Sequence, residues 1–337
     1  MLTTPVCELL GLEAPVLSVG FGPGARPELA AAVSNAGGLG VLGCSGLGLD
    51  GVRRLADDTR GLTDRPFGAN VIVHNEIAAE TIDACLECEI PVLVLFWGDA
   101  EPYVGRGARV LLQVGSVEEA KRAAAAGVDA VIAQGWEAGG HVSGRTALSV
   151  LVPAIVDAIA PVPVLASGGI ADGRGLAAAL ALGAQGVSLG TRFVASTEAN
   201  LPDEWKRRVV EGGAEDTVYS EDLFDGGWVA PHRVLRNRVV REWEASGEKH
   251  EGTIGEFVRF NGDRIDVPRY AAFMATPQFE GDLEDVPLWA GQSAALVHDV
   301  KDAGEIVREL VRDAETALYS VTTYSNAAQQ SSAKSRS

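Results

Sequence analysis

The chain has few positive charges and no long apolar run. Lys and Arg number 28 against 46 Asp and Glu, so the formal net charge of the 337 residues is −18. A surface this acidic repels phosphate backbones and anionic lipid headgroups, so we expect neither nucleic acid nor a membrane as partner. Neither a signal-peptide pattern nor an apolar stretch of membrane length occurs, and we therefore expect a cytoplasmic protein.

Cysteine is scarce, and its placement argues against a metal site. The four cysteines are Cys7, Cys44, Cys85 and Cys88. The last two form a C-x-x-C in a predicted helix, with no second Cys or His pair nearby. We expect reduced, small apolar side chains and no metal, with zinc or redox use as the less favoured alternative.

Three familiar catalytic motifs are also missing. The sequence has no G-x-S-x-G elbow, no H-E-x-x-H and no phosphate-binding loop with a lysine. Serine hydrolase, zinc protease and P-loop functions therefore lose support.

What the sequence does contain is a repeated unit, a short apolar run followed by a helical stretch. Eight such runs are predicted strands, at residues 16–19, 40–42, 71–73, 92–96, 110–114, 130–134, 164–167 and 186–190. Strands that alternate with helices pair in parallel through right-handed crossovers. Eight units within 200 residues predict an α/β protein with a closed (β/α)₈ barrel.

The repeat ends near residue 200, and the remaining chain divides into three predicted parts. After a barrel over residues 1–200, we expect a smaller, mainly helical cap over 201–288, with helices at 204–210 and 232–246. An amphipathic segment, 289–320, is predicted to return to the barrel. The polar tail 321–337 is predicted to be disordered.

Ligand sites of such barrels lie at the carboxyl ends of the strands, where the sequence carries unusual residues. The loop after 130–134 holds Gly139, Gly140 and His141, and an imidazole there can move a proton or donate a hydrogen bond to a substrate. Glu137 in the same loop has no clear role. His74, just past the third strand, is a weaker candidate for a residue at the rim of this ligand site.

The turns after the last two strands suggest a phosphate site. Ser167, Gly168 and Gly169 follow the seventh strand, and Asp172 is placed to cap the next helix. Gly190 and Thr191 follow the eighth. Backbone N–H groups, a helix dipole and a hydroxyl can hold a phosphate there, although the glycines can also merely permit tight turns. A phosphorylated cofactor would then carry the chemistry, and flavin mononucleotide (FMN) fits best.

Five segments resemble the nitronate monooxygenase family, barrel enzymes that bind FMN. They are PELAAAVSNAGGLGVLG, RPFGANV, GWEAGGHVSG, VPVLASGGIADGRGLAAALALGAQGVSLGTRF and LWAGQS. The resemblance implies that His141 meets the substrate. It implies that FMN is contacted by Gly20, Phe21, Gly22, Asn70, Gln113, Gly139, Ser167, Gly168, Gly169, Gly190 and Thr191.

The resemblance also implies a reaction, the oxidation of an alkyl nitronate by O₂ to a carbonyl compound and nitrite. The turn VGFGPG departs from the methionine-containing stretch usual in nitronate oxidisers. Similar barrels transfer hydride from NAD(P)H to a quinone or to an enoyl thioester, and that reaction is the alternative prediction. A flavin-binding sensor without turnover is a third hypothesis. The expected partners are thus a small nitronate or quinone-like substrate, O₂ and NAD(P)H, with a homodimer left open.

Overall fold

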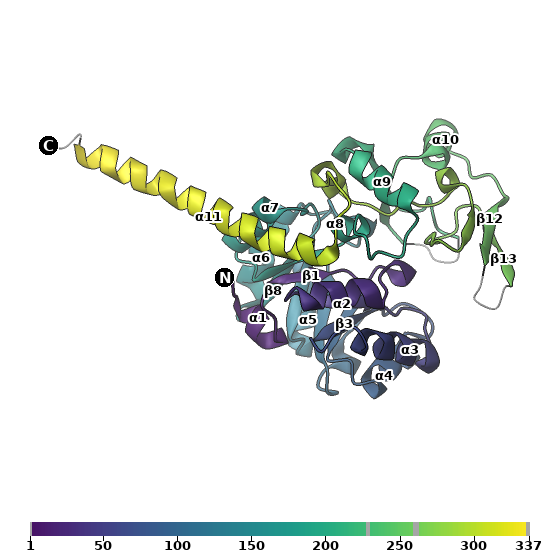
Figure 1. Cartoon of the computed structure of the whole chain (residues 1–337), viewed down its shortest axis with the longest axis horizontal. Helices are drawn as coiled ribbons and strands as arrows, with labels where there is room; N and C mark the ends of the chain where they lie inside the picture. Colours follow the sequence, from purple (N-terminus) through teal and green to yellow (C-terminus); the bar gives the residue numbers. More distant parts are fainter. Residues whose placement is uncertain (1, 227–229, 259–262, 335–337) are drawn as a thin grey trace.

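The computed structural model describes residues 2–226, 230–258 and 263–334, and it shows a barrel with a cap at one end (Figure 1). The parallel strands run in the order β1-β9-β8-β6-β5-β4-β3-β2. Leu39 closes the ring, because its N–H donates to Val16 O at 2.9 Å and its carbonyl accepts from Ser18 N at 3.0 Å. The predicted (β/α)₈ barrel is confirmed.

All eight predicted strands are present. Their bounds are β1 (Val16–Ser18), β2 (Gly40–Gly43), β3 (Phe67–Ile72), β4 (Val92–Phe96), β5 (Arg109–Val114), β6 (Ala130–Gln134), β8 (Val164–Ser167) and β9 (Gly186–Leu189). The largest difference is at β3, which begins at Phe67 instead of at residue 71. Gly68 and Ala69 have low intrinsic strand preference, so only pairing with β2 and β4 shows that they belong to the strand.

Helices follow the strands and cover the outside of the barrel. They are α2 (Pro27–Asn35), α3 (Leu49–Arg60), α4 (Ala78–Glu87), α5 (Val117–Ala126), α6 (Leu148–Ile159) and α7 (Gly173–Ala181). Asp172 caps α7 as predicted, accepting from Arg174 N at 3.0 Å and Gly175 N at 3.2 Å. Between β4 and β5 stands only a short 3-10 turn, η2 (Glu101–Tyr103).

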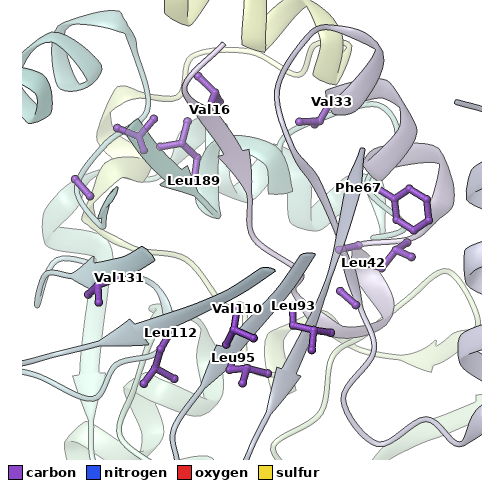
Figure 2. Packing of buried hydrophobic residues seen from close by; sticks show 14 of the residues in the cluster. Val16, Val33, Leu42, Phe67, Leu93, Leu95, Val110, Leu112, Val131 and Leu189 are labelled. Atoms are coloured by element: carbon purple, nitrogen blue, oxygen red, sulfur yellow. The ribbon is translucent and has the colours of Figure 1, made fainter. Parts of the chain in front are cut away.

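The barrel has two apolar layers, because successive strand residues face opposite sides. The outer layer packs under the helices, and Figure 2 shows Leu93 and Leu95 of β4 beside Val110 and Leu112 of β5. The inner layer fills the barrel. Its amino end is closed by α1 (Pro5–Leu10), a helix that the strand–helix repeat did not predict.

The predicted mainly helical cap is wrong in its secondary structure. Its helices are α9 (Asp203–Glu211) and α10 (Arg238–Ser246). Its strands are β10 (Thr217–Ser220), β11 (His232–Leu235), β12 (Thr253–Val258), β13 (Arg264–Pro268) and β14 (Phe279–Gly281). They form one sheet of order β13-β12-β14 and another of order β10-β11-β7, in which β7 (Gly140–His141) comes from the barrel loop.

The error has two local causes. The predicted helix 232–246 is a strand followed by a helix, because Asn237 accepts a hydrogen bond from Val240 N and starts α10 at residue 238. Strands β12 and β13 carry charged residues such as Glu256 and Arg264, so they lack the apolar alternation that marks a strand. Their pairing with each other supplies the backbone hydrogen bonds instead.

The chain returns to the barrel through η5 (Gln292–Leu296) and α11 (Ala303–Lys334). Helix α11 packs against α7 and α2 and then extends away from the barrel (Figure 1). Gly173 permits this contact, because a Cβ there would lie 2.4 Å from Ala314 N. Residues 321–334 of the predicted disordered tail continue the helix, since no proline or glycine stops it; residues 335–337 lie outside the described residues.

All four cysteines are free and buried. A hydrogen bond to Cys44 and burial raise the pKa of the Cys85 thiol far above its usual range, so this thiol is neutral. Among the described residues, no group of three or more His, Cys, Asp or Glu side chains could hold a metal ion. No helix in the described part of the chain is both long and apolar enough to cross a membrane.

Candidate active site

A cavity of about 380 Å³ lies where the strands end, beneath the cap. This volume is within the ~300–1,000 Å³ usual for small-molecule sites. The barrel supplies one side of it through the ends of β1, β3, β4, β5, β6, β8 and β9. The cap and the return segment supply the other through Trp205, Phe257, Phe273, Met274, Trp289 and Ser293.

The structure brings together nearly all of the residues predicted for the site. His141 lines the cavity, as do Gly20, Phe21, Gly22, Asn70, Gln113, Gly139, Ser167, Gly168, Gly190 and Thr191. Gly169 is the exception. Its φ of +69° requires a glycine, and a Cβ there would lie 3.4 Å from Glu137 Cβ, outside the cavity lining.

His141 is held by a small sheet and by two tryptophans. Strand β7 pairs with β11, and His141 stands directly opposite His232. Gln134 fixes the loop, because its Nε2 donates to His141 O at 2.8 Å. The imidazole centroid lies 5.4 Å from the Trp97 ring and 5.3 Å from the Trp289 ring. The ring is therefore presented to the cavity from an enclosed, aromatic position.

This environment keeps His141 neutral. Burial, with a smaller contribution from His232, lowers its pKa from 6.5 to about 3. Burial also lowers the pKa of His232, whose Nδ1 lies 2.8 Å from Ala230 O and whose Nε2 accepts from Phe224 N at 3.4 Å. Those two contacts assign a neutral Nδ1–H tautomer to His232. At neutral pH the site thus holds imidazoles and no imidazolium.

The lowered pKa predicts how stability depends on pH. The unfolded chain protonates His141 near pH 6.5, whereas the folded chain resists protonation down to about pH 3. The contribution of the neutral ring to the free energy of unfolding is therefore complete above pH ~6.5, and it is lost progressively as the pH falls toward 3. Urea titrations of wild type and His141→Gln, at about pH 7.5 and about pH 5, measure it. Wild type should lose more stability than the variant; equal losses would contradict the prediction.

Glu137 has a structural role in this loop. Both of its carboxylate oxygens accept from Leu148 N at 3.1 Å, which caps the start of α6. Its carbonyl accepts from Gln292 N at 2.9 Å and so ties the loop to the return segment.

Gly139 is needed for close backbone packing. A Cβ at this position would lie 2.2 Å from Gly291 N and 2.3 Å from the Ala290 carbonyl carbon. The glycine thus lets the histidine loop and the return segment touch. The family resemblance assigned this glycine to the cofactor ring; the segment that it packs against begins 151 residues further along the chain, at Ala290.

We predict that Gly139→Ala destabilises the protein by about 1–3 kcal/mol, because neither backbone can give way without moving the wall of the cavity. Denaturant unfolding measures the change. Gly22→Ala is the control, because it adds a methyl group to another glycine of the cavity lining without a steric clash: a Cβ there would meet nothing within 4 Å. The φ of +50° at Gly22 adds some backbone strain to this variant. A Gly139→Ala protein as stable as wild type would show that the contact is dispensable.

The turns after β8 and β9 form an open, polar wall. Gly168 has a φ of +103°, which a side chain would strain, and a Cβ on Gly190 would meet only Val19, at 3.8 Å. Thr191 Oγ1 accepts from Gly291 N at 2.9 Å, so its own proton is available for another acceptor. These groups suit a phosphate. Asn70 and Gln113 place carboxamides on the strands across the cavity.

His74 lies apart from this cavity. It is exposed and lines a second cavity beside α5. The sequence analysis did not identify the aromatic residues of the cap or Trp97 as site residues. Phe257, Phe273 and Trp97 come from strands and loops without an apolar period, and Trp205 lies in helix α9. Of these segments, only LWAGQS, which contains Trp289, carried a recognisable signal.

The cavity has no ionised wall. Among the described residues that line it, none is Asp, Glu, Lys or Arg. Its polar groups are the carboxamides of Asn70, Gln113 and Gln134, hydroxyls, backbone and the neutral His141. A site of this kind favours an uncharged group next to the imidazole, because an ion there would lose its hydration without gaining a counter-charge.

Comparison with known proteins identifies the family. A family model described as nitronate monooxygenase matches residues 3–93 and 104–313. The chain belongs to this family. As a nitronate monooxygenase family member, it is an oxidoreductase.

The names of proteins similar to this chain describe different reactions. A (3aS,4S,5R,7aS)-5-hydroxy-7a-methyl-1-oxo-octahydro-1H-indene-4-carboxyl-CoA dehydrogenase of Mycobacterium tuberculosis is 34% identical over 94% of this chain and 97% of its own. A nitronate monooxygenase of Paraburkholderia phytofirmans is 29% identical with the same coverage. The structure of FabK from Thermotoga maritima superposes with a TM-score of 0.81, at 33% identity, over 96% of this chain and 100% of that one. Family membership therefore establishes the class of enzyme and leaves the substrate to be argued from the site.

Proposed function

We propose that this enzyme binds FMN and transfers a hydride to or from an uncharged acyl thioester. The observation that carries the proposal is the cavity lining, which combines one neutral imidazole with carboxamides and aromatic rings and holds no ionised side chain among its described residues. The name of the Mycobacterium tuberculosis relative, a carboxyl-CoA dehydrogenase, supports a thioester.

The residues present fit FMN. Ser167, Gly168, Gly190 and Thr191 would hold its phosphate through backbone N–H groups and hydroxyls. Gly20, Phe21 and Gly22 would lie against its ring, and Asn70 and Gln113 would hydrogen-bond to the ring edge. When bound, FMN supplies a hydride acceptor or donor. Gly169 is better assigned to the turn itself, since it faces Glu137.

His141 would act on the substrate carbonyl. A neutral imidazole donates one hydrogen bond, and this bond would stabilise the negative charge that develops on the thioester oxygen when a hydride adds to the β-carbon of an enoyl thioester; a water molecule would then give the α-carbon its proton. Trp97 and Trp289 keep the ring oriented and exclude water from it. The cap side chains Phe257, Phe273 and Met274 offer an apolar surface for the acyl group.

Nitronate oxidation with O₂, predicted first from the sequence, is the second candidate. The match to the nitronate monooxygenase model favours it, as does a hydrogen-bond donor facing the cavity. It ranks behind a thioester because the carboxyl-CoA dehydrogenase of Mycobacterium tuberculosis is 34% identical to this chain and the nitronate monooxygenase of Paraburkholderia phytofirmans 29%. A quinone as hydride acceptor and a homodimer also remain predictions.

Anaerobic spectroscopy separates these functions. The protein is loaded with FMN, and its visible spectrum is followed while NADH, NADPH, an acyl-CoA, an enoyl-CoA and an alkyl nitronate are added in turn. Bleaching by acyl-CoA, or bleaching by NAD(P)H with recovery on enoyl-CoA, supports the proposal. Bleaching by nitronate alone, with nitrite released in air, supports the second candidate. A protein that takes up no FMN contradicts both.

A further inference from the structure

A second cavity, of about 580 Å³, lies beside the first. It is enclosed by the segment after β4 and by helix α5, where the barrel has only η2 between its fourth and fifth strands. Its lining includes Trp97, Gly98, Leu112, Val114, Ala123 and Ala126. Gln113 lines both cavities, so they adjoin at the end of β5.

Trp97 stands at the boundary between the two cavities. Phe96 lines the first cavity and Trp97 the second, and their rings stack with centroids 4.6 Å apart. The same indole lies 5.4 Å from His141. Its backbone has a φ of +50°, which is unusual for a residue with a side chain, and strain of this kind concentrates at functional sites. Packing fixes the turn, since Gly98 leaves no room for a Cβ beside Val73.

The two cavities differ in chemistry. The first has no ionised residue among the described ones that line it, whereas the second is lined by His74, Asp99, Glu101, Glu119 and Arg122. The alanines of α5 and the Trp97 ring add apolar surface. The three carboxylates of the second cavity and His74 suit the N–H groups of a flexible neutral chain that carries amides, and an anionic end of that chain would have to pair with Arg122. Gln113 lines both cavities, so a flexible ligand could extend from one into the other at the end of β5.

We propose that the second cavity binds the phosphopantetheine arm of the thioester substrate, with the acyl group held beside His141 in the first. This inference rests on the proposed thioester function. The amide groups of the arm would meet Gln113, His74 and the carboxylates, and its phosphate would meet Arg122. Coenzyme A and an acyl carrier protein both present this arm, so the site would recognise what they share.

Calorimetric binding of free ligands tests the proposal without any turnover. Pantetheine, 4′-phosphopantetheine and CoA are titrated into the FMN-loaded protein and into Ala126→Trp, whose indole would fill the second cavity. Lys121→Trp, on the same helix but away from the cavity lining, is the matched control. We expect at least about tenfold weaker binding of all three ligands to Ala126→Trp and unchanged binding to the control. Equal affinity of both variants, or no binding to the wild type, overturns the proposal.

The charge of Arg122 provides a second, independent measurement. Arg122→Glu should weaken the binding of phosphopantetheine and of CoA by about tenfold and leave the binding of pantetheine unchanged. Arg106→Glu lies outside both cavities and should change the affinity for none of the three ligands.

The relative affinities of the wild type indicate the source of the arm. An affinity for CoA no higher than that for phosphopantetheine favours a carrier protein, and a higher affinity for CoA favours CoA itself. Ligand binding without thioester turnover would contradict the proposed function alone. Thioester turnover without any binding of the free arm would contradict this inference alone.

Discussion

Replacing His141 by asparagine should lower turnover by about 10²–10⁴-fold, the range expected when a positioned proton-transfer or hydrogen-bonding group is removed. The ring lies at the cavity between Trp97 and Trp289, and nothing ionised lines the described part of that cavity to take its place. FMN content should not change, because the phosphate wall lies on other strands. Steady-state kinetics with the thioester, or with the nitronate, gives the loss, and the visible spectrum gives the flavin content.

The matched control is His298→Asn, since His298 is an exposed histidine outside the cavity lining. Its kinetics should equal those of the wild type. The pH profile adds a further check, because the pKa of His141 near 3 predicts no change in activity from its titration between about pH 6 and pH 9. Full activity of His141→Asn with any substrate would remove the residue from the mechanism and would support a site that binds flavin without using this ring.

Gly190→Asp should weaken FMN binding by about a hundredfold or more. A Cβ at Gly190 meets only Val19, at 3.8 Å, and the backbone φ of −99° is an ordinary one, so the fold should tolerate a side chain. A carboxylate there would face the phosphate, and two like charges about 4 Å apart cost several kcal/mol at the effective dielectric constant of a protein surface. Flavin fluorescence during titration of the apoprotein measures the dissociation constant.

Gly190→Asn separates charge from size in this experiment. Its side chain has the same shape as aspartate and no charge, so it should bind FMN more tightly than Gly190→Asp by at least about tenfold. The two apoproteins should melt at the same temperature, which would show that the fold is intact. Equal affinity of the two variants for FMN would show that the phosphate is not held at this turn.

The two cavities offer an explanation for the range of reactions named among the relatives. The barrel and its strand ends would supply the flavin site, while residues from the cap and from the segment after β4 would contact what lies above it. Those segments have little sequence periodicity, so they can change without disturbing the barrel. We therefore expect substrate preference to vary with Phe257, Phe273 and Trp97 more than with the turns after β8 and β9.

The sequence alone determined the barrel, its strand order and most of the candidate site. Apolar runs such as 92–96 and 130–134 are buried on both faces, so the strands could be read without any partner. The carboxyl ends of parallel strands meet at one mouth, and that rule placed Asn70, Gln113 and Ser167 together.

Only the tertiary structure decided what lies above those strand ends. The cap strands β12 and β13 exist because they pair with each other, and the charge of Glu256 and Arg264 hides them from a search for apolar alternation. The neutral state of His141 follows from burial by rings that are distant in sequence. Gly139 was predicted to contact the cofactor, and the structure adds that its missing side chain makes room for Ala290 and Gly291. Long-range contacts of this kind leave no local pattern in the sequence. The barrel could therefore be predicted from the sequence, whereas the residues that face the substrate could be identified only in the folded structure.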